Sequence, residues 1–563
     1  MRLDKITIGS PKDSPTHRFK NLKNVTVDFD QDHWVTVVIG WNGTGKSNVL
    51  EALAIIFRDL ITKQRAPAFA FQLAYRIGKG DETRHIHIDA DPDRSGELYR
   101  IHVATDAEAR GEGTLTPFIE GEPAISALRG PALKLNAFLA QDAKYLPRYV
   151  FSYYSGESLR MQDVFRPYLE AYDKKLRNGE DPGLKRLFYA LPVHSQFVLL
   201  AFLIQQTDAV ERFLAEHLGI DPTEGIESVL FVLRQPPWKT KASDGDPRFW
   251  NARGVVSEFL YRLYDVALAP IEITRRVQVS LWNEKTLQFK YLYVKDIASL
   301  RRLVGKQQPA DFFRDLESTY VSELIDEVRI RICIKHNDDS VTFRELSEGE
   351  RQLLTVLGLL RFTAEGESLF LLDEPDTHLN PRWQYDYLTM IQTLAKTDDD
   401  RCHLVLTTHN PLVIGGLRKE QVRVLNRSTD EFIEAIEPND DPIGIGIEGL
   451  LKSELFGLRS SLSSEILDKI DRHYWLLGQP EKTDDEKDEL RRLGGELNKL
   501  GISQTHPNPY FEEFAKALAR RTPEPPSDLS REEIEDQAEL ADSVLKEVLE
   551  AQASEPPQSA GQP

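Results

Sequence analysis

Residues 37–48, with the sequence VVIGWNGTGKSN, combine glycines, a lysine and a hydroxyl group at a spacing that suits polyphosphate binding. Four residues separate Gly40 from Gly45, and Lys46 and Ser47 follow at once, as in the phosphate-loop template. Glycine lets the chain curl tightly enough for a ring of backbone N–H groups to surround phosphate at a helix N-terminus. The lysine adds a point charge toward the β- and γ-phosphates, and the serine hydroxyl can ligate Mg²⁺. The residues predicted to surround ATP are Gly40, Asn42, Gly43, Thr44, Gly45, Lys46, Ser47 and Asn48.

A second stretch, residues 368–375 (SLFLLDEP), is an apolar strand that ends in two carboxylates. Asp373 is predicted to hold Mg²⁺ beside Ser47, directly or through water. Glu374 is then free to orient and deprotonate the water that attacks the γ-phosphate. The alternative, a strand followed by an ordinary turn, is less favoured because the phosphate loop already lies upstream at a plausible distance. We therefore predict that Glu374 is the catalytic base.

Residues 346–352 (LSEGERQ) resemble the signature motif of the ATP-binding-cassette superfamily, which usually has a Ser-Gly-Gly-Gln core. Ser347 and Gly349 match that core, whereas Glu348 and Glu350 depart from it and are expected to point away from phosphate. The motif opens a helix, so its N–H groups form a second positive dipole end. The resemblance implies that Ser347 and Gly349 meet the γ-phosphate bound by the opposite subunit. It therefore implies a head-to-tail homodimer, or a higher even-numbered oligomer, with shared ATP sites.

The same superfamily supplies expectations for three more positions. His409, near the end of residues 405–411 (VLTTHNP), matches the histidine that contacts the γ-phosphate, and it joins Glu374 in the expected catalytic set. Asp376 lies where relatives place the loop that crosses the dimer interface. The glutamine loop of the superfamily is not clear in this sequence. Gln162 is the glutamine nearest to residues 151–157 (FSYYSGE), and its role stays open.

These matches cover residues 1–62 and 341–412 and resemble the soluble branch with the SMC, RecF and overcoming-lysogenisation-defect ATPases, not membrane transporters. The Lys-Ser-Asn that closes the loop and the gap of roughly 300 residues before the signature favour this branch. Residues 153–156 (YYSG) and 453–458 (SELFGL) resemble, more narrowly, the ATPases of Septu and retron-associated anti-phage systems. In those systems an ATPase of similar size, without a nuclease domain, works with a separate HNH nuclease. The resemblance therefore implies a separate nuclease subunit as partner.

The length and composition of the chain limit its number of domains and the class of protein to which it belongs. The 563-residue chain is too long for one simple core, so two or three domains are expected. The longest apolar run, residues 197–204, is far too short to cross a bilayer and predicts a buried helix. The N-terminus lacks the apolar core of a secretory signal, and two cysteines, Cys333 and Cys402, are too few for a disulfide framework. We expect a cytoplasmic protein without a membrane partner.

The order of the elements predicts an α/β fold with a largely parallel sheet. The resemblance implies that this fold is an ATP-binding-cassette head with a mixed sheet and helices. The head is expected at residues 1–62 and 328–436, split by a lid insertion at 63–327 that is mixed β and then helical. In the insertion we predict a β-hairpin at 83–104 and helices at 188–218 and 255–268, without the heptads of a coiled-coil arm. Residues 437–552 are expected to be helical, near 463–477, 483–500, 510–520 and 531–551. A disordered tail is expected at 553–563.

Three functions stay open: a defence ATPase that controls a nuclease partner, a DNA repair or chromosome-handling ATPase, and a nucleotide-gated scaffold without nucleic-acid contact. The net charge of −20 does not exclude DNA or RNA, because a local basic patch suffices. A nuclease in this chain is not expected, since Glu437, Asp440 and Asp441 lie in a turn without the βα alternation of a Toprim domain. The candidate nucleic-acid contacts are Arg275, Arg276, Arg301, Arg302, Lys306, Arg329 and Arg331.

Overall fold

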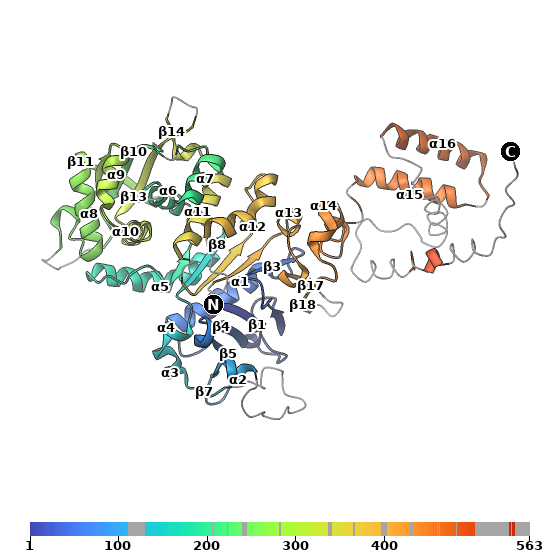
Figure 1. Cartoon of the computed structure of the whole chain (residues 1–563), viewed down its shortest axis with the longest axis horizontal. Coiled ribbons are helices and arrows are strands. Elements are labelled where there is room, and N and C mark those ends of the chain that lie inside the picture. Colours follow the sequence, from blue (N-terminus) through green and yellow to red (C-terminus); the bar gives the residue numbers. More distant parts are fainter. Residues whose placement is uncertain are drawn as a thin grey trace. The chain divides into compact units, whose positions relative to one another are not determined.

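A computed structural model describes two units of the chain, residues 1–439 and 440–563. The larger unit contains three β-sheets with helices packed on them (Figure 1). The described residues are 1–110, 130–156, 158–204, 207–221, 223, 225–238, 245–280, 283–335, 340–363, 366–395, 402–427, 432–458, 460, 462–479, 481–500, 540–541 and 543–546.

The central sheet of the larger unit carries the phosphate loop. Its strands run in the order β18-β17-β3-β16-β15-β8-β9, and all neighbours are parallel except β17 and β18. Every residue of β3, β15 and β16 is buried, as expected for strands covered on both faces. Because they are parallel, the ends that carry Gly40, Asp373 and Thr407 lie at one edge of the sheet. The strands are β3 (Val35–Gly40), β8 (Tyr149–Tyr154), β9 (Leu187–Tyr189), β15 (Ser368–Asp373), β16 (Cys402–Thr407), β17 (Val422–Arg427) and β18 (Ile433–Ile436).

A six-stranded antiparallel sheet, in the order β2-β1-β4-β5-β6-β7, joins the central sheet through α1 (Lys46–Ile61). The buried side chains of α1 share one hydrophobic cluster with strands of both sheets. The expected hairpin is present as β5 and β6. Strands on either side of residue 62 belong to this one sheet, so the fold has no break at the expected start of the insertion. The strands are β1 (Arg2–Ile8), β2 (Val25–Asp28), β4 (Phe71–Ile77), β5 (Arg84–Ala90), β6 (Tyr99–Thr105) and β7 (Ala132–Leu133).

The third sheet forms the core of a compact insert, as expected in place of a coiled-coil arm. Its order is β11-β12-β10-β13-β14, and all its pairs are antiparallel. β13 was expected in the head, but it pairs with β10 in this sheet. The β11–β12 hairpin was not expected, because Pro270 and the two arginines at 275 and 276 weaken the alternation of Ile271 and Ile273. The strands are β10 (Ile226–Arg234), β11 (Leu268–Ser280), β12 (Asn283–Val294), β13 (Ile325–Cys333) and β14 (Ser340–Thr342).

Helix α6 (Val193–Ile204) connects the insert to the head. It contains the longest apolar run, is buried as expected, and packs against α10 (Pro309–Val321) and α11 (Glu348–Thr363). Glu317 of α10 is buried and accepts a hydrogen bond from His194 Nε2 at 2.8 Å. The expected helical stretch at 188–218 is thus divided into β9, α6, α7 (Asp208–Arg212) and a π-helical turn, Phe213–His217.

The remaining helices of the larger unit lie between these strands. The helix expected at 255–268 is present as α8. These helices are α2 (Asp106–Arg110), α3 (Leu135–Ala140), α4 (Asp142–Tyr145), α5 (Arg160–Arg177), α8 (Gly254–Val266), α9 (Ile297–Val304), α12 (Pro381–Ala395) and α13 (Pro411–Ile414).

The smaller unit is helical over its described residues. It contains α14 (Pro442–Lys452), interrupted at Gly446, and the packed pair α15 (Ser464–Gly478) and α16 (Asp484–Lys499). The last two agree with the helices expected near 463–477 and 483–500. The helix expected at 510–520, most of the one at 531–551 and the tail lie outside the described residues. Among the helices that the structure describes, none has the length and hydrophobicity needed to span a bilayer.

His403, on β16, links the antiparallel sheet to the central sheet. Its Nδ1 accepts a hydrogen bond from the backbone N–H of Leu3 at 2.9 Å, and its Nε2 lies 3.0 Å from Thr36 Oγ1. Since Nδ1 accepts, the proton of the neutral ring is on Nε2. Burial holds the pKa of His403 well below its ordinary value. The folded unit therefore resists protonation of this ring, whereas the unfolded chain accepts the proton near pH 6.5.

We expect this histidine to make the larger unit less stable in mild acid. Its contribution is fully present above pH 6.5 and decreases as the pH falls below that value. A folded state that leaves the ring neutral loses ~1.4 kcal/mol between pH 7.5 and 5.5 from this group. Glutamine can keep both hydrogen bonds without titrating, so His403→Gln should reduce the pH dependence of urea unfolding by that amount. Equal pH dependence in the two proteins would contradict the assignment.

Candidate nucleotide site

The phosphate loop between β3 and α1 adopts a conformation that requires glycine at two positions. Gly40 and Gly45 have φ angles of 145° and 95°. A Cβ atom at Gly40 would lie 2.4 Å from the carbonyl oxygen of Leu425, and one at Gly45 would lie 2.8 Å from the side chain of Leu22. No side chain caps the N-terminus of α1 among the described residues. Its first N–H groups are therefore available to an anion.

Asn21, which the sequence did not single out, braces this loop from the segment before β2. Its Nδ2 donates to the carbonyl oxygen of Gly43 at 2.8 Å, and its Oδ1 accepts from Asn48 Nδ2 at 2.7 Å. Within the loop, Thr44 Oγ1 donates to the carbonyl oxygen of Trp41 at 2.8 Å. These hydrogen bonds hold together the part of the loop that contains Asn42, Gly43 and Thr44, and they connect it through Asn21 to Asn48. A lone asparagine far upstream of a motif carries no recognisable signal.

Lys46 lies inside the loop. Its Nζ donates to the carbonyl oxygens of Gly40 and Trp41 at 2.9 and 3.2 Å, and the residue is only 6% exposed. Burial lowers the pKa of Lys46, while the carboxylates of Glu374 and Asp373 act in the opposite direction. The ammonium group is thus held between the loop carbonyls and the two acidic residues, where it can attract phosphate.

Ser47 and Asp373 come together at the edge of the central sheet. Ser47 Oγ donates to Asp373 Oδ1 at 3.0 Å, although the residues lie 326 positions apart in the chain. Asp373 is 1% exposed and also accepts from Thr407 Oγ1 at 2.5 Å. Burial raises the pKa of Asp373 against the effect of these hydrogen bonds. A bound cation would favour its charged form.

These two oxygen groups fit Mg²⁺. The ion prefers oxygen ligands and is usually held by one or two carboxylates together with phosphate oxygens and water, not by an all-protein cage. Accordingly, the described residues contain no cluster of three or more potential metal-ligating side chains. Ser47 and Asp373 would hold the ion, and the uncapped end of α1 would hold the phosphates.

Glu374 lies in a strained turn directly after β15. Its φ angle is 51°, in the left-handed region that residues with a Cβ atom seldom adopt. Its Oε1 lies 3.1 Å from Nε2 of His409, and this hydrogen bond lowers the pKa of Glu374. The structure thus brings the two expected catalytic residues together. Glu374 is a carboxylate at neutral pH, and its position is fixed by the backbone and by the histidine.

Asp376, two residues further on, is not at a surface. It is 4% exposed and accepts from Thr408 Oγ1 at 3.0 and 3.1 Å. Burial raises its pKa. Its carboxylate therefore holds the turn after β15 to the end of β16, and any contact that this turn makes with another subunit comes from its neighbours.

The turn with Ser347 and Gly349 opens α11 as expected. Ser347 and Glu350 form a capping box: the carboxylate accepts from the N–H and Oγ of Ser347 at 2.6 and 2.7 Å, and Ser347 Oγ accepts from the N–H of Glu350 at 3.2 Å. We expected Glu350 to point away from the phosphate-binding group, but its carboxylate lies on Ser347 itself. Glu348 lies 3.4 Å from His378. A Cβ atom at Gly349 would lie 2.5 Å from the carbonyl oxygen of His378, so glycine is required there.

Gln162 does not contact the two carboxylates in the structure. It lines a cavity of about 450 Å³ that also borders Tyr153, Tyr189 and Arg351. Gln352 of α11 lines the same cavity and donates through Nε2 to the carbonyl oxygen of Pro375. The turn after β8 is thus adjacent to the signature helix, and Gln162 lines the cavity between them.

The residue that reaches Asp373 from this region is Arg160, which sequence reasoning missed. Its Nη2 donates to Asp373 Oδ2 at 3.3 Å, and its guanidinium carbon lies 5.2 Å from the ring centre of Tyr154. The only available signal was its place shortly after the Tyr-Tyr-Ser-Gly stretch, where the superfamily has its glutamine.

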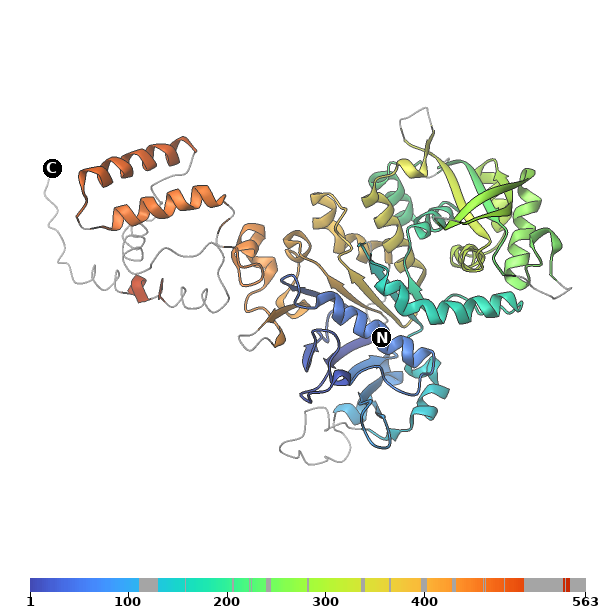
Figure 2. The same cartoon turned by 180° about the vertical axis from the view of Figure 1, so that it is seen from behind.

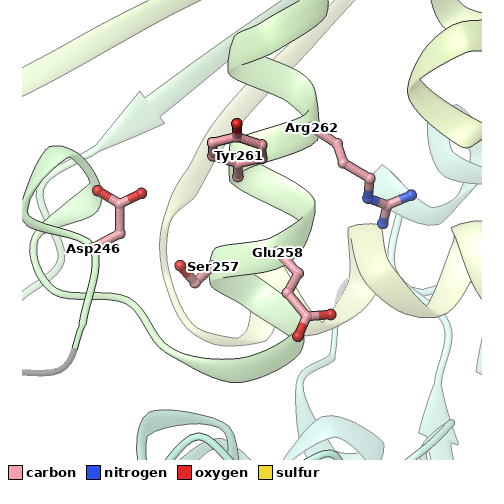
Figure 3. Close-up of a pocket in the computed structure, with 5 residues that line it drawn as sticks. All are labelled: Asp246, Ser257, Glu258, Tyr261 and Arg262. Carbon is pink, nitrogen blue, oxygen red and sulfur yellow. The ribbon is translucent and has the colours of Figure 1, made fainter.

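Another cavity, of about 460 Å³, lies in the insert (Figure 3). Tyr261 and Arg262 line it from α8, and Asp246 from the preceding loop, with Ser257 and Glu258 completing it. Arg262 donates to Asp315 Oδ2 at 2.5 Å, so its charge is already compensated. No residue of the nucleotide motifs lines this cavity, and it has no part in the site.

Three of the candidate nucleic-acid contacts form ion pairs within the insert. Arg329 lies 2.7 Å from Glu327, Arg331 lies 2.6 Å from Glu227, and Arg275 lies 3.8 Å from Asp326. Arg275 also lies over the ring of Phe289. Because their charges are compensated locally, these arginines provide little net attraction for a phosphate backbone.

Two family models match the chain. One, described as an AAA ATPase domain, matches residues 17–95, and the other, described as "AAA domain, putative AbiEii toxin, Type IV TA system", matches residues 224–415. The first contains the phosphate loop, and the second contains the signature turn, both carboxylates and His409. The chain carries an AAA-family ATPase domain. The P-loop fold of this ATPase domain, with its α/β architecture, agrees with the fold class expected from the sequence.

Two curated relatives align with parts of this chain. The Septu protein PtuA of Bacillus mycoides (strain KBAB4) is 28% identical over 198 residues, covering 33% of this chain and 27% of the relative. The Retron Vc95 probable ATPase of Vibrio cholerae serotype O1 biovar El Tor is 29% identical over 143 residues, covering 22% of this chain and 27% of the relative. The chain thus aligns with about a quarter of the length of either relative.

One solved structure, that of Stu0660 of Streptococcus thermophilus, aligns with 91% of this chain and 99% of its own. The identity is 11% and the TM-score is 0.28. A score this low supports no comparison of the two folds.

The position of Lys46 predicts that ATP binding depends on it. Lys46→Ala removes the ammonium group from the phosphate loop and should weaken ATP binding about tenfold or more, as expected for a hydrogen bond to a charged group. Calorimetric titration with Mg·ATP measures this change. Lys134→Ala, at an exposed lysine ahead of α3, is the matched control and should bind as the unchanged protein does. Equal affinity in the two variants would exclude this loop as the phosphate site.

Proposed function

We propose that this chain is a Mg²⁺-dependent ATPase that forms its two ATP sites between two copies of itself. The observation that carries the proposal is the meeting of Ser47 with Asp373 at the end of β15, with Glu374 held next to it by His409. A phosphate loop, a metal-binding carboxylate and a second, ionised carboxylate are the parts that phosphoryl transfer to water requires.

Each residue has a role in this proposal. The N–H groups of the phosphate loop and Lys46 hold the β- and γ-phosphates. Ser47 and Asp373 hold Mg²⁺, which when bound neutralises charge on the β- and γ-phosphate oxygens. Glu374 orients the attacking water and takes its proton. His409 holds Glu374 in place and also contacts the γ-phosphate. Glu374 is only partly buried, so water can reach its carboxylate.

The signature turn supplies the second half of the site. Ser347 and Gly349 open α11, a helix of 16 residues whose N-terminal N–H groups suit an anion. In the proposed dimer, this end of one copy contacts the γ-phosphate held by the other. For Ser347 Oγ to donate to phosphate, it has to exchange its bond to Glu350 for the new one. ATP thereby favours the closed dimer, and hydrolysis reopens it.

The biological role that fits best is defence against phage, in which the ATPase controls a separate nuclease. Support comes from the names of the two aligned relatives, a Septu protein and a retron ATPase, and from the Tyr-Tyr-Ser-Gly stretch at 153–156. Direct DNA or RNA binding has less support, because ion pairs compensate three of the seven basic groups that the sequence offered, Arg275, Arg329 and Arg331.

The base assignment is tested by Glu374→Gln. Glutamine keeps the size of the side chain but cannot take a proton, so the variant should bind ATP and hydrolyse it at least about 100-fold more slowly. It should also accumulate as an ATP-dependent dimer, because reopening requires hydrolysis. Phosphate release measures the rate, and light scattering after gel filtration measures the mass.

Glu434→Gln is the control for this experiment, since Glu434 is an exposed glutamate on β18, away from the motifs. It should leave both rate and mass unchanged. Hydrolysis by Glu374→Gln at the rate of the unchanged protein would show that another group acts as the base.

A further inference from the structure

Arg160 is placed to act on the nucleotide site from the first residue of α5. Its Nη2 donates to Asp373 Oδ2 at 3.3 Å, and its Nε lies 3.9 Å from Glu51 of α1. Asp373 is shared between two sides: its Oδ1 accepts from Ser47 and Thr407, and its Oδ2 faces Arg160. The guanidinium is therefore on the opposite side of the carboxylate from the expected metal position.

Apart from the contact with Asp373, no hydrogen bond from the guanidinium to another described residue is seen. An arginine has five N–H donors and typically binds a carboxylate through two parallel bonds of 2.7–2.9 Å. Here one donor reaches Asp373 at a longer distance, and the buried Nε has no hydrogen-bond partner among the described residues. Buried donors without a partner are uncommon in folded proteins and call for an explanation. A phosphate oxygen would supply the missing acceptor.

The surroundings of Arg160 indicate which phosphate this would be. Its charge acts on Glu374, the proposed base, as well as on Asp373. Ser47 and Asp373 would hold Mg²⁺ for the β- and γ-phosphates, and Glu374 would activate the water that attacks the γ-phosphate. A group near both carboxylates is therefore on the γ side of the nucleotide, away from the α-phosphate.

We propose that Arg160 is a ligand of the γ-phosphate supplied by the same chain, so that it distinguishes ATP from ADP. This inference rests on the proposed function, since it requires ATP at the phosphate loop. It assigns to an arginine the place after β8 where the superfamily has a glutamine. Its planar fork can bind two oxygens of one phosphate, which a glutamine cannot do.

Helix α5 gives this contact a route to the insert. The helix packs against α1 at one end and against α8 and α10 further along, and Tyr172 Oη lies 3.3 Å from Ser318 of α10. Figure 2 shows α5 extending from the central sheet toward the insert. A change at its first residue therefore shifts an element that both the site and the insert contact, and the γ-phosphate is sensed where this helix begins.

The test compares the affinity of the full chain for two ligands, Mg·ADP and the Mg complex of the non-hydrolysable β,γ-imido analogue of ATP. Arg160→Gln should weaken binding of the analogue about tenfold or more while changing that of ADP by less than about twofold. Arg160→Lys, which keeps the charge but not the fork, should lose less of this preference. Arg166→Gln, at an exposed arginine of the same helix, should change neither affinity.

Three outcomes would overturn the inference. Equal loss of both ligands in Arg160→Gln would mean that the arginine only orients Asp373. No loss of either would mean that it does not contact the nucleotide. Binding of neither ligand by the unchanged protein would refute the proposed function and this inference with it. Thermal unfolding of each variant shows that the comparison is made between folded proteins.

Discussion

The hydrogen bond between Ser47 and Asp373 is the contact on which the rest of the site depends. It joins the first turn of α1 to the end of β15, two elements that are separated in sequence by an insert with its own sheet. The contact exists because β3, β16 and β15 are parallel neighbours in the central sheet, so their carboxyl ends lie at the same edge. A shift in the register of any one strand would move a motif away from the others.

The packing around the carboxyl edge of the central sheet keeps the motifs aligned with one another. Helix α1 is buried between two sheets, and this fixes the phosphate loop that precedes it. The strained backbone of Glu374 is held by its N–H bond to the carbonyl oxygen of Thr407 on the neighbouring strand. On the other side, Gln352 of α11 bonds to the carbonyl oxygen of Pro375, so the signature helix and the catalytic turn are attached to each other. The end of β15 and the turn after it are thus in direct contact with α11 through Gln352 and with α5 through Arg160.

The sequence predicted the central part of this fold because its motifs carry geometric requirements. Glycines at 40 and 45 avoid clashes that any side chain would cause, and the acidic pair comes at the end of a strand whose residues are all buried. The predicted α/β fold and the meeting of Ser47, Asp373, Glu374 and His409 followed from these features. The domain boundaries were harder to predict, since β4 to β6 complete a sheet that begins before the phosphate loop.

Other contacts gave no readable signal. Arg160 and Asn21 each bond to a residue that is remote in the sequence. A single sequence does not show which remote residues are in contact. The capping role of Glu350 is an exception, because the Ser-x-x-Glu spacing is itself the sequence pattern of a capping box. The sequence did not reveal that Arg329 and Arg331 of the insert form ion pairs. Their acidic partners lie two residues away or on a neighbouring strand.

The central claim, that each ATP site is built from two copies, is tested most directly by mixing two inactive variants. Lys46→Ala damages the phosphate loop, and Ser347→Arg damages the signature turn. In a mixed dimer both changes fall in one site and the other site is intact, so a 1:1 mixture should recover about a quarter of the full ATPase rate if the sites act independently. A mixture that stays as inactive as its components, or Ser347→Arg alone hydrolysing at full rate, would contradict the account.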